Sequence, residues 1–117
     1  MSANHKPRSG EVVLVYATFP SQDEAERVGG DLVDRGIVAC VNILPAMTSL
    51  YIWQGQRQRE AECVMIAKTR ASLTATLVAE ITQLHSYDTP AVVVLPVSGG
   101  SEPFLAWVEA QTTTPSQ

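Results

Sequence analysis

The chain has 117 residues, of which 45% are hydrophobic and 17% are charged, and its formal net charge is -4. This length and composition predict a single globular domain with its own core and leave no room for a second domain. The acidic balance gives no basic field to attract a nucleic acid, and no run approaches the roughly 20 apolar residues of a membrane helix.

The chain opens with a polar stretch, residues 1–10, which we predict to be a flexible tail. It lacks the apolar segment of a signal peptide, so we expect a cytoplasmic protein. Residues 11–111 form the predicted domain, and residues 112–117 a second flexible tail.

The first predicted strand is the apolar run from Val12 to Ala17, which is typical of a strand buried on both faces. Ser21 and Glu24 then form a capping box, in which each side chain satisfies a backbone N–H at the start of a helix. The helix is predicted to end at Gly36, because glycine readily adopts the left-handed conformation that terminates many helices. The pair Gly29-Gly30 weakens this helix, so we expect both glycines to serve close packing against a sheet.

The segment from Ile37 to Trp53 predicts a long strand with a bulge or an edge at Pro45, which has no N–H to donate. Residues 54–59 form a polar reversal, and residues 60–69 return as the third strand. The two cysteines, Cys40 and Cys63, fall in these strands. A reversal at residues 55–58 sets Cys63 near Leu50 and far from Cys40, so we predict two free, core-type thiols.

A second helix is predicted from Ser72, as its cap, to His85. Residues 91–95 form the fourth strand, Gly99-Gly100 a turn, and Ser101 opens a last helix. The order β-α-β, β-α-β with right-handed crossovers predicts a ferredoxin-like α+β fold: a four-stranded antiparallel sheet with its helices on one face.

The third predicted strand has apolar residues on both faces, and the helices can cover only one of them. Val64 and Ile66 point one way, while Met65 and Ala67 point the other. Monomers seldom expose apolar patches beyond a few hundred Å², so we infer that the second face is buried against copies of the same chain in a closed oligomer.

Few residues of the predicted domain have side chains suited to metal binding, ligand binding or catalysis. His85 is the only histidine of the predicted domain; it is a candidate metal ligand or a plain C-capping residue. Cys40 is a candidate soft ligand, but no spacing supports a closed zinc site, so any metal would need groups from neighbouring subunits or would bind weakly. Lys68 shares a strand face with Glu62 and either holds a ligand or reaches to water from a strand edge.

Other candidates are weaker. Trp53 and Tyr51 suit either a subunit contact or a pocket wall. The glycines before Ser101 favour an ordinary turn over an anion site, because the longer phosphate-binding pattern is missing. Cys40 and His85 are the one nucleophile-base pair on offer, and nothing places them together, so no enzyme is predicted.

The chain nevertheless resembles the CutA divalent-cation tolerance family from Val13 to Glu109, with matching residues in order and at the family's spacing. They are Ala39-Cys40-Val41-Asn42-Ile43-Leu44-Pro45, Ser49-Leu50-Tyr51, Trp53, Gly55, Glu62, Lys68-Thr69, His85, Tyr87, Pro90, Pro96, Leu105 and Trp107.

This resemblance implies a ferredoxin-like trimer in which long strands join neighbouring subunits, a cytoplasmic role in tolerance to copper and other divalent ions, and a kinship with PII signalling proteins. The cleft candidates that it implies are Cys40, Trp53, Glu62, Lys68, His85 and Tyr87. The chain departs from the family at Ser86 and Ala91, which remove a Pro and a Glu, and at Ala17 and Leu84, which remove a Cys and a His found in members with richer metal ligation.

Two functions follow as hypotheses. In the first, a homotrimer binds a soft or borderline divalent ion such as Cu²⁺ through His85, Cys40 and Glu62 in clefts between subunits. In the second, a PII-like regulatory trimer holds a small anionic effector at Lys68, with Trp53, Glu62 and Tyr87 in the cleft. An enzyme that uses Lys68, Glu62 and Tyr87 as acid and base groups ranks behind both.

Overall fold

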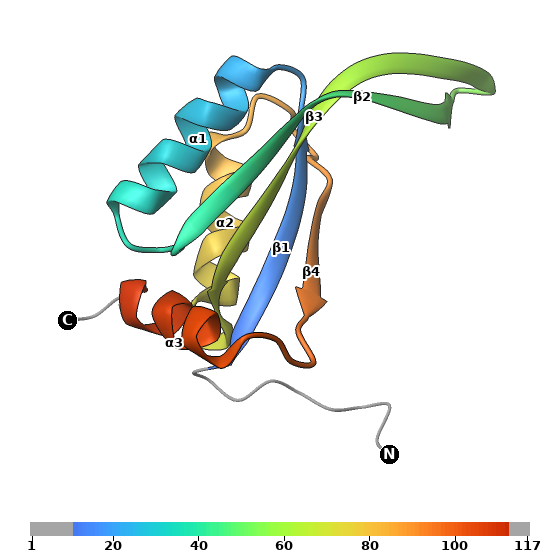
Figure 1. Cartoon of the computed structure of the whole chain (residues 1–117). Coiled ribbons are helices and arrows are strands. Elements are labelled where there is room, and N and C mark those ends of the chain that lie inside the picture. Colours follow the sequence, from blue (N-terminus) through green and yellow to red (C-terminus); the bar gives the residue numbers. More distant parts are fainter. Residues whose placement is uncertain (1–10, 113–117) are drawn as a thin grey trace.

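The structure is a computed structural model that describes residues 11–112. The predicted tail at residues 1–10 and residues 113–117 of the second tail lie outside the described residues. The elements in chain order (Figure 1) are β1 (Val12–Phe19), α1 (Gln22–Asp34), β2 (Cys40–Trp53), β3 (Gln56–Arg70), the short 3-10 helix η1 (Ala71–Leu73), α2 (Thr74–Leu84), β4 (Val92–Pro96) and α3 (Glu102–Gln111).

The four strands form one antiparallel sheet in the order β2-β3-β1-β4. β1 lies between β3 and β4, so each β-α-β half contributes an inner and an outer strand. This order confirms the predicted four-stranded antiparallel sheet and α+β class. It also leaves β2 and β4 as the two edges of the sheet.

Helices α1 and α2 cover the same face of the sheet (Figure 1). The side chains of β1 that point at them, among them Val15, Ala17 and Phe19, are fully buried, and Met65 and Ala67 of β3 join the same core. Helix α3 departs from the predicted arrangement. It lies across one end of the sheet, where its Val108 packs against Val12 and Ala39 in a separate cluster.

The long strand β2 breaks its register where Pro45 was predicted to interrupt it. Leu44 pairs with Val64, but the next pair is Met47 with Glu62, and Ala46 takes a φ of 64°. The predicted bulge is therefore confirmed. Beyond it, the outer halves of β2 and β3 curve away from the body as a two-stranded arm (Figure 1). We call residues 47–62 the arm.

The arm ends in a tighter turn than the predicted six-residue reversal. Gln54 and Gly55 have φ values of 51° and 80°, the pair of positive angles that a two-residue type I′ hairpin turn requires. β3 therefore begins at Gln56 instead of Glu60. The shift also corrects the predicted position of Cys63, which pairs with Phe19 of β1 beside the bulge and not with the region of Leu50. Both cysteines are free, but Cys40 is only half-buried.

The caps of the helices were predicted in part. The Ser21 hydroxyl accepts a hydrogen bond from the backbone N–H of Glu24 at 3.1 Å, and Ser101 caps α3, as expected. Ser72 does not cap α2: it lies within η1, and α2 begins without a side-chain cap. Gly36 takes the expected positive φ, 72°.

The two helix glycines differ. A Cβ on Gly29 would lie 2.9 Å from Cγ2 of Val41, whereas nothing lies within 4 Å of the same position on Gly30. Close packing against the sheet is thus confirmed for Gly29 and wrong for Gly30, because α1 turns only one of these adjacent positions toward β2.

Thr112, predicted to begin the second flexible tail, is buried. Its hydroxyl donates to the carbonyl of Val108 at 3.0 Å and accepts from Nε of Arg70 at 3.0 Å. Arg70 also donates to the carbonyl of Glu109. The end of α3 is therefore tied to β3, and the ordered domain extends at least to this residue.

The face of the sheet opposite α1 and α2 is largely uncovered. By register, Leu44, Val93 and Leu95 lie on this face, and each is at least 42% exposed. The arm adds further exposed apolar side chains, Trp53 on one of its faces and Leu50 and Ile52 on the other, all 62 to 66% exposed. The uncovered face of the sheet is the bare apolar face that the sequence predicted. Within the described residues, no helix is long and apolar enough to cross a membrane.

Candidate functional site

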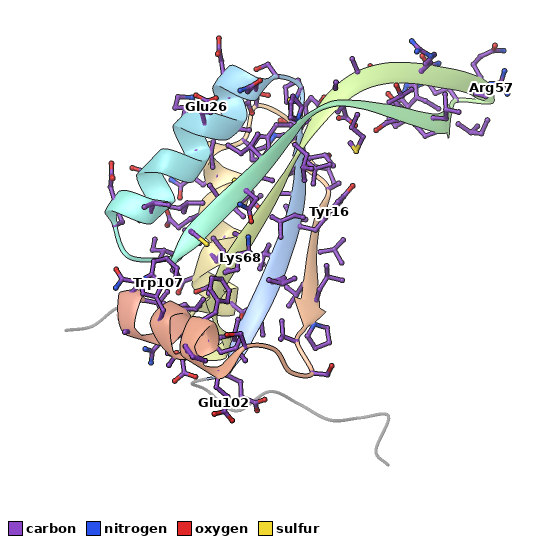
Figure 2. The ribbon with its side chains drawn as sticks, in the orientation of Figure 1. Tyr16, Glu26, Arg57, Lys68, Glu102 and Trp107 are labelled. Carbon is purple, nitrogen blue, oxygen red and sulfur yellow. The ribbon has the colours of Figure 1, made fainter. Side chains whose placement is uncertain are left out.

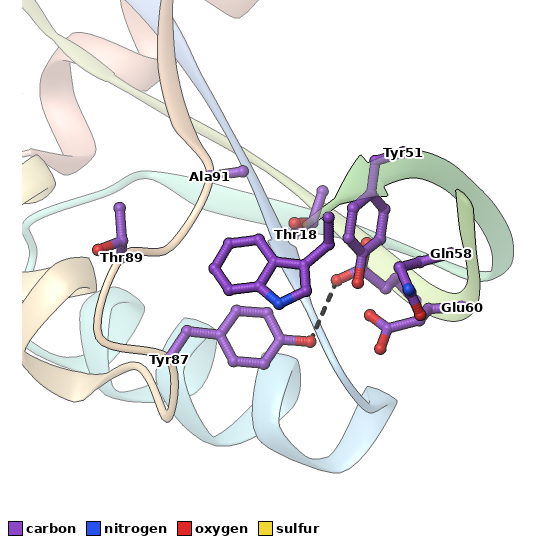
Figure 3. Close-up of a pocket in the computed structure, with 9 residues that line it drawn as sticks. Thr18, Tyr51, Gln58, Glu60, Tyr87, Thr89 and Ala91 are labelled. Carbon is purple, nitrogen blue, oxygen red and sulfur yellow. Dashed lines mark hydrogen bonds between the residues drawn. The ribbon is translucent and has the colours of Figure 1, made fainter. Parts of the chain in front are cut away.

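A pocket of about 640 Å³ opens where the arm meets the loop that follows α2 (Figure 3). The described residues that line it are Thr18, Tyr51, Trp53, Gln58, Glu60, Glu62, Tyr87, Thr89 and Ala91. Three of the predicted cleft residues, Trp53, Glu62 and Tyr87, therefore come together in one subunit.

The pairing of the arm explains this gathering. Tyr51 pairs with Gln58 and Trp53 with Gln56, so these side chains project from the same face of the arm. Glu60 and Glu62, two residues apart on β3, lie on that same face. The bulge curves the arm so that this face turns toward the loop after α2, which supplies Tyr87.

Glu62 is the best-anchored carboxylate of the pocket. Its Oε1 accepts a hydrogen bond from the Ser49 hydroxyl at 2.7 Å. Its Oε2 accepts one from the Tyr87 hydroxyl at 3.2 Å, which Figure 3 draws as a dashed line. Partial burial raises the pKa of Tyr87, and the charge and hydrogen bond of Glu62 raise it further, to about 12. The Tyr87 hydroxyl is therefore protonated at neutral pH and acts as a donor to Glu62.

Glu60 and Tyr51 line the pocket nearer the tip of the arm. The hydrogen bond to Glu60 is the main cause that raises the pKa of Tyr51, followed by desolvation and by the charges of Glu60 and Glu62. Of the described residues that line the pocket, none is basic, so the site presents negative charge and aromatic rings.

His85 lies buried beside this pocket instead of in it. Its ring stacks on Phe19 with the centroids 4.5 Å apart. Nε2 lies 2.7 Å from the carbonyl oxygen of Thr18 and donates to it, and Nδ1 accepts from the backbone N–H of Tyr87 at 3.0 Å. Both ring nitrogens are thus engaged within the chain, and a metal at either would have to displace a hydrogen bond.

Glu24 ties the same loop to α1. Its carboxylate accepts from the backbone N–H of Ser86 at 2.9 Å and lies 3.5 Å from Nδ1 of His85. Partial burial acts to raise the pKa of Glu24, but the hydrogen bonds from Ser86, with the nearby His85 and Arg27, outweigh burial and lower it. The predicted capping box is corrected here: only its serine half forms, because the glutamate holds the loop in place.

Cys40 and Lys68 lie elsewhere. They are paired across β2 and β3 on the uncovered face, and Lys68 is six residues, roughly 20 Å, from Glu62 along its strand. Lys68 shares the face with Glu62, as predicted, but the two cannot meet within one chain. Among the described residues, Lys68 has no ion-pair partner.

The described residues of one chain assemble no metal centre. The described residues contain no group of three or more His, Cys, Asp or Glu side chains that could hold an ion. Cys40 lies four residues, roughly 13 Å along β2, from Leu44, the residue level with Thr18 and hence with His85. The structure therefore does not bring the two predicted ligands together.

Sequence reasoning missed the paired role of Glu60 and Glu62. The signal was their spacing of two residues on a strand, which places both carboxylates on one face. The pairing of the two carboxylates was not recognised because the reversal was predicted to extend to residue 59, which made Glu60 the first residue of the strand. The anchoring of Glu62 by Ser49 depends on a register that only the correct turn defines.

The family model described as "CutA1 divalent ion tolerance protein" matches residues 13–111, nearly the whole described domain. The chain belongs to this CutA1 family. Relatives support the same assignment at moderate identity. The chain is 38% identical over 100 residues to "Protein CutA 1, chloroplastic" of rice and 37% identical over 100 residues to "Divalent-cation tolerance protein CutA" of Pectobacterium atrosepticum.

These matches cover 86% of the chain in both cases, with 56% of the rice protein and 91% of the Pectobacterium protein. The chain thus spans little more than half the length of the plant relative. Among solved structures, CutA1 from Oryza sativa superposes with a TM-score of 0.85 at 37% identity, covering 88% of this chain and 94% of that one. The CutA1 architecture is therefore shared over the whole domain.

Proposed function

We propose that this CutA1 protein acts in divalent-cation tolerance as a homotrimer that binds a soft or borderline divalent ion, such as Cu²⁺, at sites shared between subunits. The arm carries the proposal. It projects from the body with Leu50 and Ile52 more than 60% exposed on one face and Trp53 equally exposed on the other. A lone two-stranded ribbon is marginal in water, so a partner is expected to cover it.

Copies of the same chain are suitable partners. The sheet has two different free edges, β2 and β4, and strand β4 exposes Val93, Val94 and Leu95. Pairing between unlike surfaces of successive subunits generates a ring when the rotation closes. Three copies, as the family resemblance implies, would hide the apolar face and create the clefts.

Metal binding is proposed at Cys40. Its thiol lies half-buried on the uncovered face, and a thiolate suits soft ions such as copper. Since one chain offers no cluster of three ligands among its described residues, the remaining ligands would come from neighbouring subunits. We give His85 a positioning role, because both its nitrogens hold other groups.

Titration calorimetry without oxygen tests this site with Cu²⁺, and with Zn²⁺ as an ion that does not oxidise thiols. We expect Cys40→Ser to abolish or strongly weaken binding. Cys63→Ser is the matched control, because Cys63 is buried on the helix-covered face, and it should bind as the wild type does. Equal binding by wild type and Cys40→Ser would refute the assignment.

A second candidate rests on Lys68, a cation on the uncovered face with no ion-pair partner among the described residues. A PII-like trimer would use it to hold a small anionic effector between subunits. A thermal-shift screen of nucleotides and organic acids tests this: a stabilising compound should lose its effect in Lys68→Gln but keep it in Arg57→Gln, at the tip of the arm. We assign no reaction to Lys68, Glu62 and Tyr87, since the family is named for tolerance and not for a catalytic activity.

We propose a cytoplasmic location, which the two free thiols support. The rice relative is named as chloroplastic, so the compartment of this chain stays a prediction. Fractionation of cells that express the chain with an epitope tag would test it.

A further inference from the structure

We propose that the pocket between the arm and the Tyr87 loop binds an organic cation, an ammonium or quaternary ammonium group on a small body. This goes beyond metal tolerance, because it uses a different part of the molecule from Cys40 and a different class of ligand. The proposal rests on three properties of the pocket: its charge, its rings and its size.

The pocket carries negative charge that no basic residue of its described lining balances. Glu60 and Glu62 contribute two carboxylates, and the Tyr87 hydroxyl donates to Glu62. The raised pKa values of Tyr51 and Tyr87 keep both hydroxyls protonated at neutral pH. An anion would meet two carboxylates and no cation, so the charge favours a positive ligand.

Three aromatic residues, Tyr51, Trp53 and Tyr87, line the same pocket (Figure 3). The Tyr51 and Trp53 side chains are 40% and 62% exposed in the single chain, so no other side chain of the described residues fully covers their rings. Aromatic faces attract alkylammonium groups through the negative charge of the π system, and the attraction is greatest for tryptophan. A hydrated inorganic ion gains little from such walls.

The size of the pocket favours a small organic molecule over a bare metal ion as the occupant. A volume of about 640 Å³ falls within the range of small-molecule sites, whereas a metal needs several ligands converging on one point. The two carboxylates have no third His, Cys, Asp or Glu grouped with them in the described part of the chain. An organic cation fits the volume, the charge and the rings together.

A basic side chain of a neighbouring subunit is the competing occupant. Lys68 is the relevant group, because it lies on the uncovered face without an ion-pair partner among the described residues. Figure 2 shows it on the central strands, away from Arg57 at the tip of the arm. In an assembled oligomer, another copy's lysine could fill the pocket and leave no room for a ligand, so the experiment must separate the two.

The test compares choline with 3,3-dimethylbutan-1-ol, which has the same shape without the charge. Calorimetry on the full-length protein should show choline bound at least about tenfold more tightly than the alcohol, with the difference shrinking as salt is added. A Trp107→Phe background leaves Trp53 as the one tryptophan, so its fluorescence should change with choline at the same midpoint.

Two variants locate the site. Trp53→Leu removes the ring and Glu60→Gln removes a charge of the pocket, and each should weaken choline binding by about tenfold. Val33→Ala, on the exposed surface of α1, is the control and should bind choline normally.

Equal affinity for choline and the alcohol in wild-type protein would overturn the proposal, and so would choline binding unchanged in both variants. Choline binding that appears only after Lys68→Gln would also overturn it, because the pocket would then belong to a neighbour's lysine. Metal titrations are separate measurements that depend on Cys40, so failure here leaves the metal proposal standing, and the reverse also holds.

Discussion

Alanine substitution at Gly29 and at Gly30 is expected to change the stability of the protein in opposite directions. Alanine is favoured over glycine inside a helix by about 1 kcal/mol at either position. At Gly29 the new methyl group would lie 2.9 Å from Cγ2 of Val41 and 3.3 Å from the sulfur of Met65. Val41 is β-branched and held in β2, so it has little freedom to move aside.

Overpacking of this kind costs about 1–3 kcal/mol, which exceeds the gain in helix propensity. Gly29→Ala should therefore lower the free energy of unfolding by up to about 2 kcal/mol, while Gly30→Ala, with open space around it, should raise it by up to about 1 kcal/mol. Urea unfolding at one fixed protomer concentration measures both. If Gly29→Ala stabilises the protein as much as Gly30→Ala does, the tight contact between α1 and β2 is wrong.

Further substitutions test the core and the site. Thr69→Val leaves the buried carbonyl of Ile37 without its 2.7 Å hydrogen bond and should cost about 1–3 kcal/mol in unfolding experiments; a neutral result would contradict that bond. The lowered pKa of Glu24 contributes stability above the ordinary value of 4.5 that is lost as the pH falls through the folded value, so Glu24→Gln should flatten the acid limb of a pH-stability curve. Tyr87 should ionise near pH 12 in an ultraviolet titration, and stability should fall between pH 10 and 12; Glu62→Gln should lower that pKa, and an unchanged value would rule out the contact.

Features set by local chemistry were predictable from the sequence. The Ser21 cap, the positive φ of Gly36 and the bulge at Pro45 each follow from what one residue type can or cannot do with its own backbone. The alternation of Val64 and Met65 likewise predicted that both faces of the sheet are apolar. These signals do not depend on knowing which segment lies across the sheet.

Features that depend on distant partners were not predictable. Glu24 lies where a capping box predicts a local bond, yet its carboxylate serves Ser86, 62 residues away. His85 carries no sign in its sequence context that Thr18 and Tyr87 engage both of its nitrogens. The position of such a side chain is decided by tertiary packing, which the pattern of one chain does not contain.

A small error in the predicted position of the arm's turn changed the predicted pairing of several residues of β3. Gln54-Gly55 is a two-residue turn, and a glycine at its second position is the usual signal. The polar residues that follow the turn predict a loop, but they form the exposed start of β3 in the arm. Placing the turn too late displaced Cys63 and hid the pairing that brings Glu60 into the pocket.

Light scattering on dilution to micromolar concentration tests the central claim most directly, because the proposed metal clefts presuppose an assembly. The account predicts a particle with three times the mass of one chain, in which the exposed arm is covered by neighbours. A stable particle with the mass of one chain would contradict it, since the apolar arm and face would then remain in water.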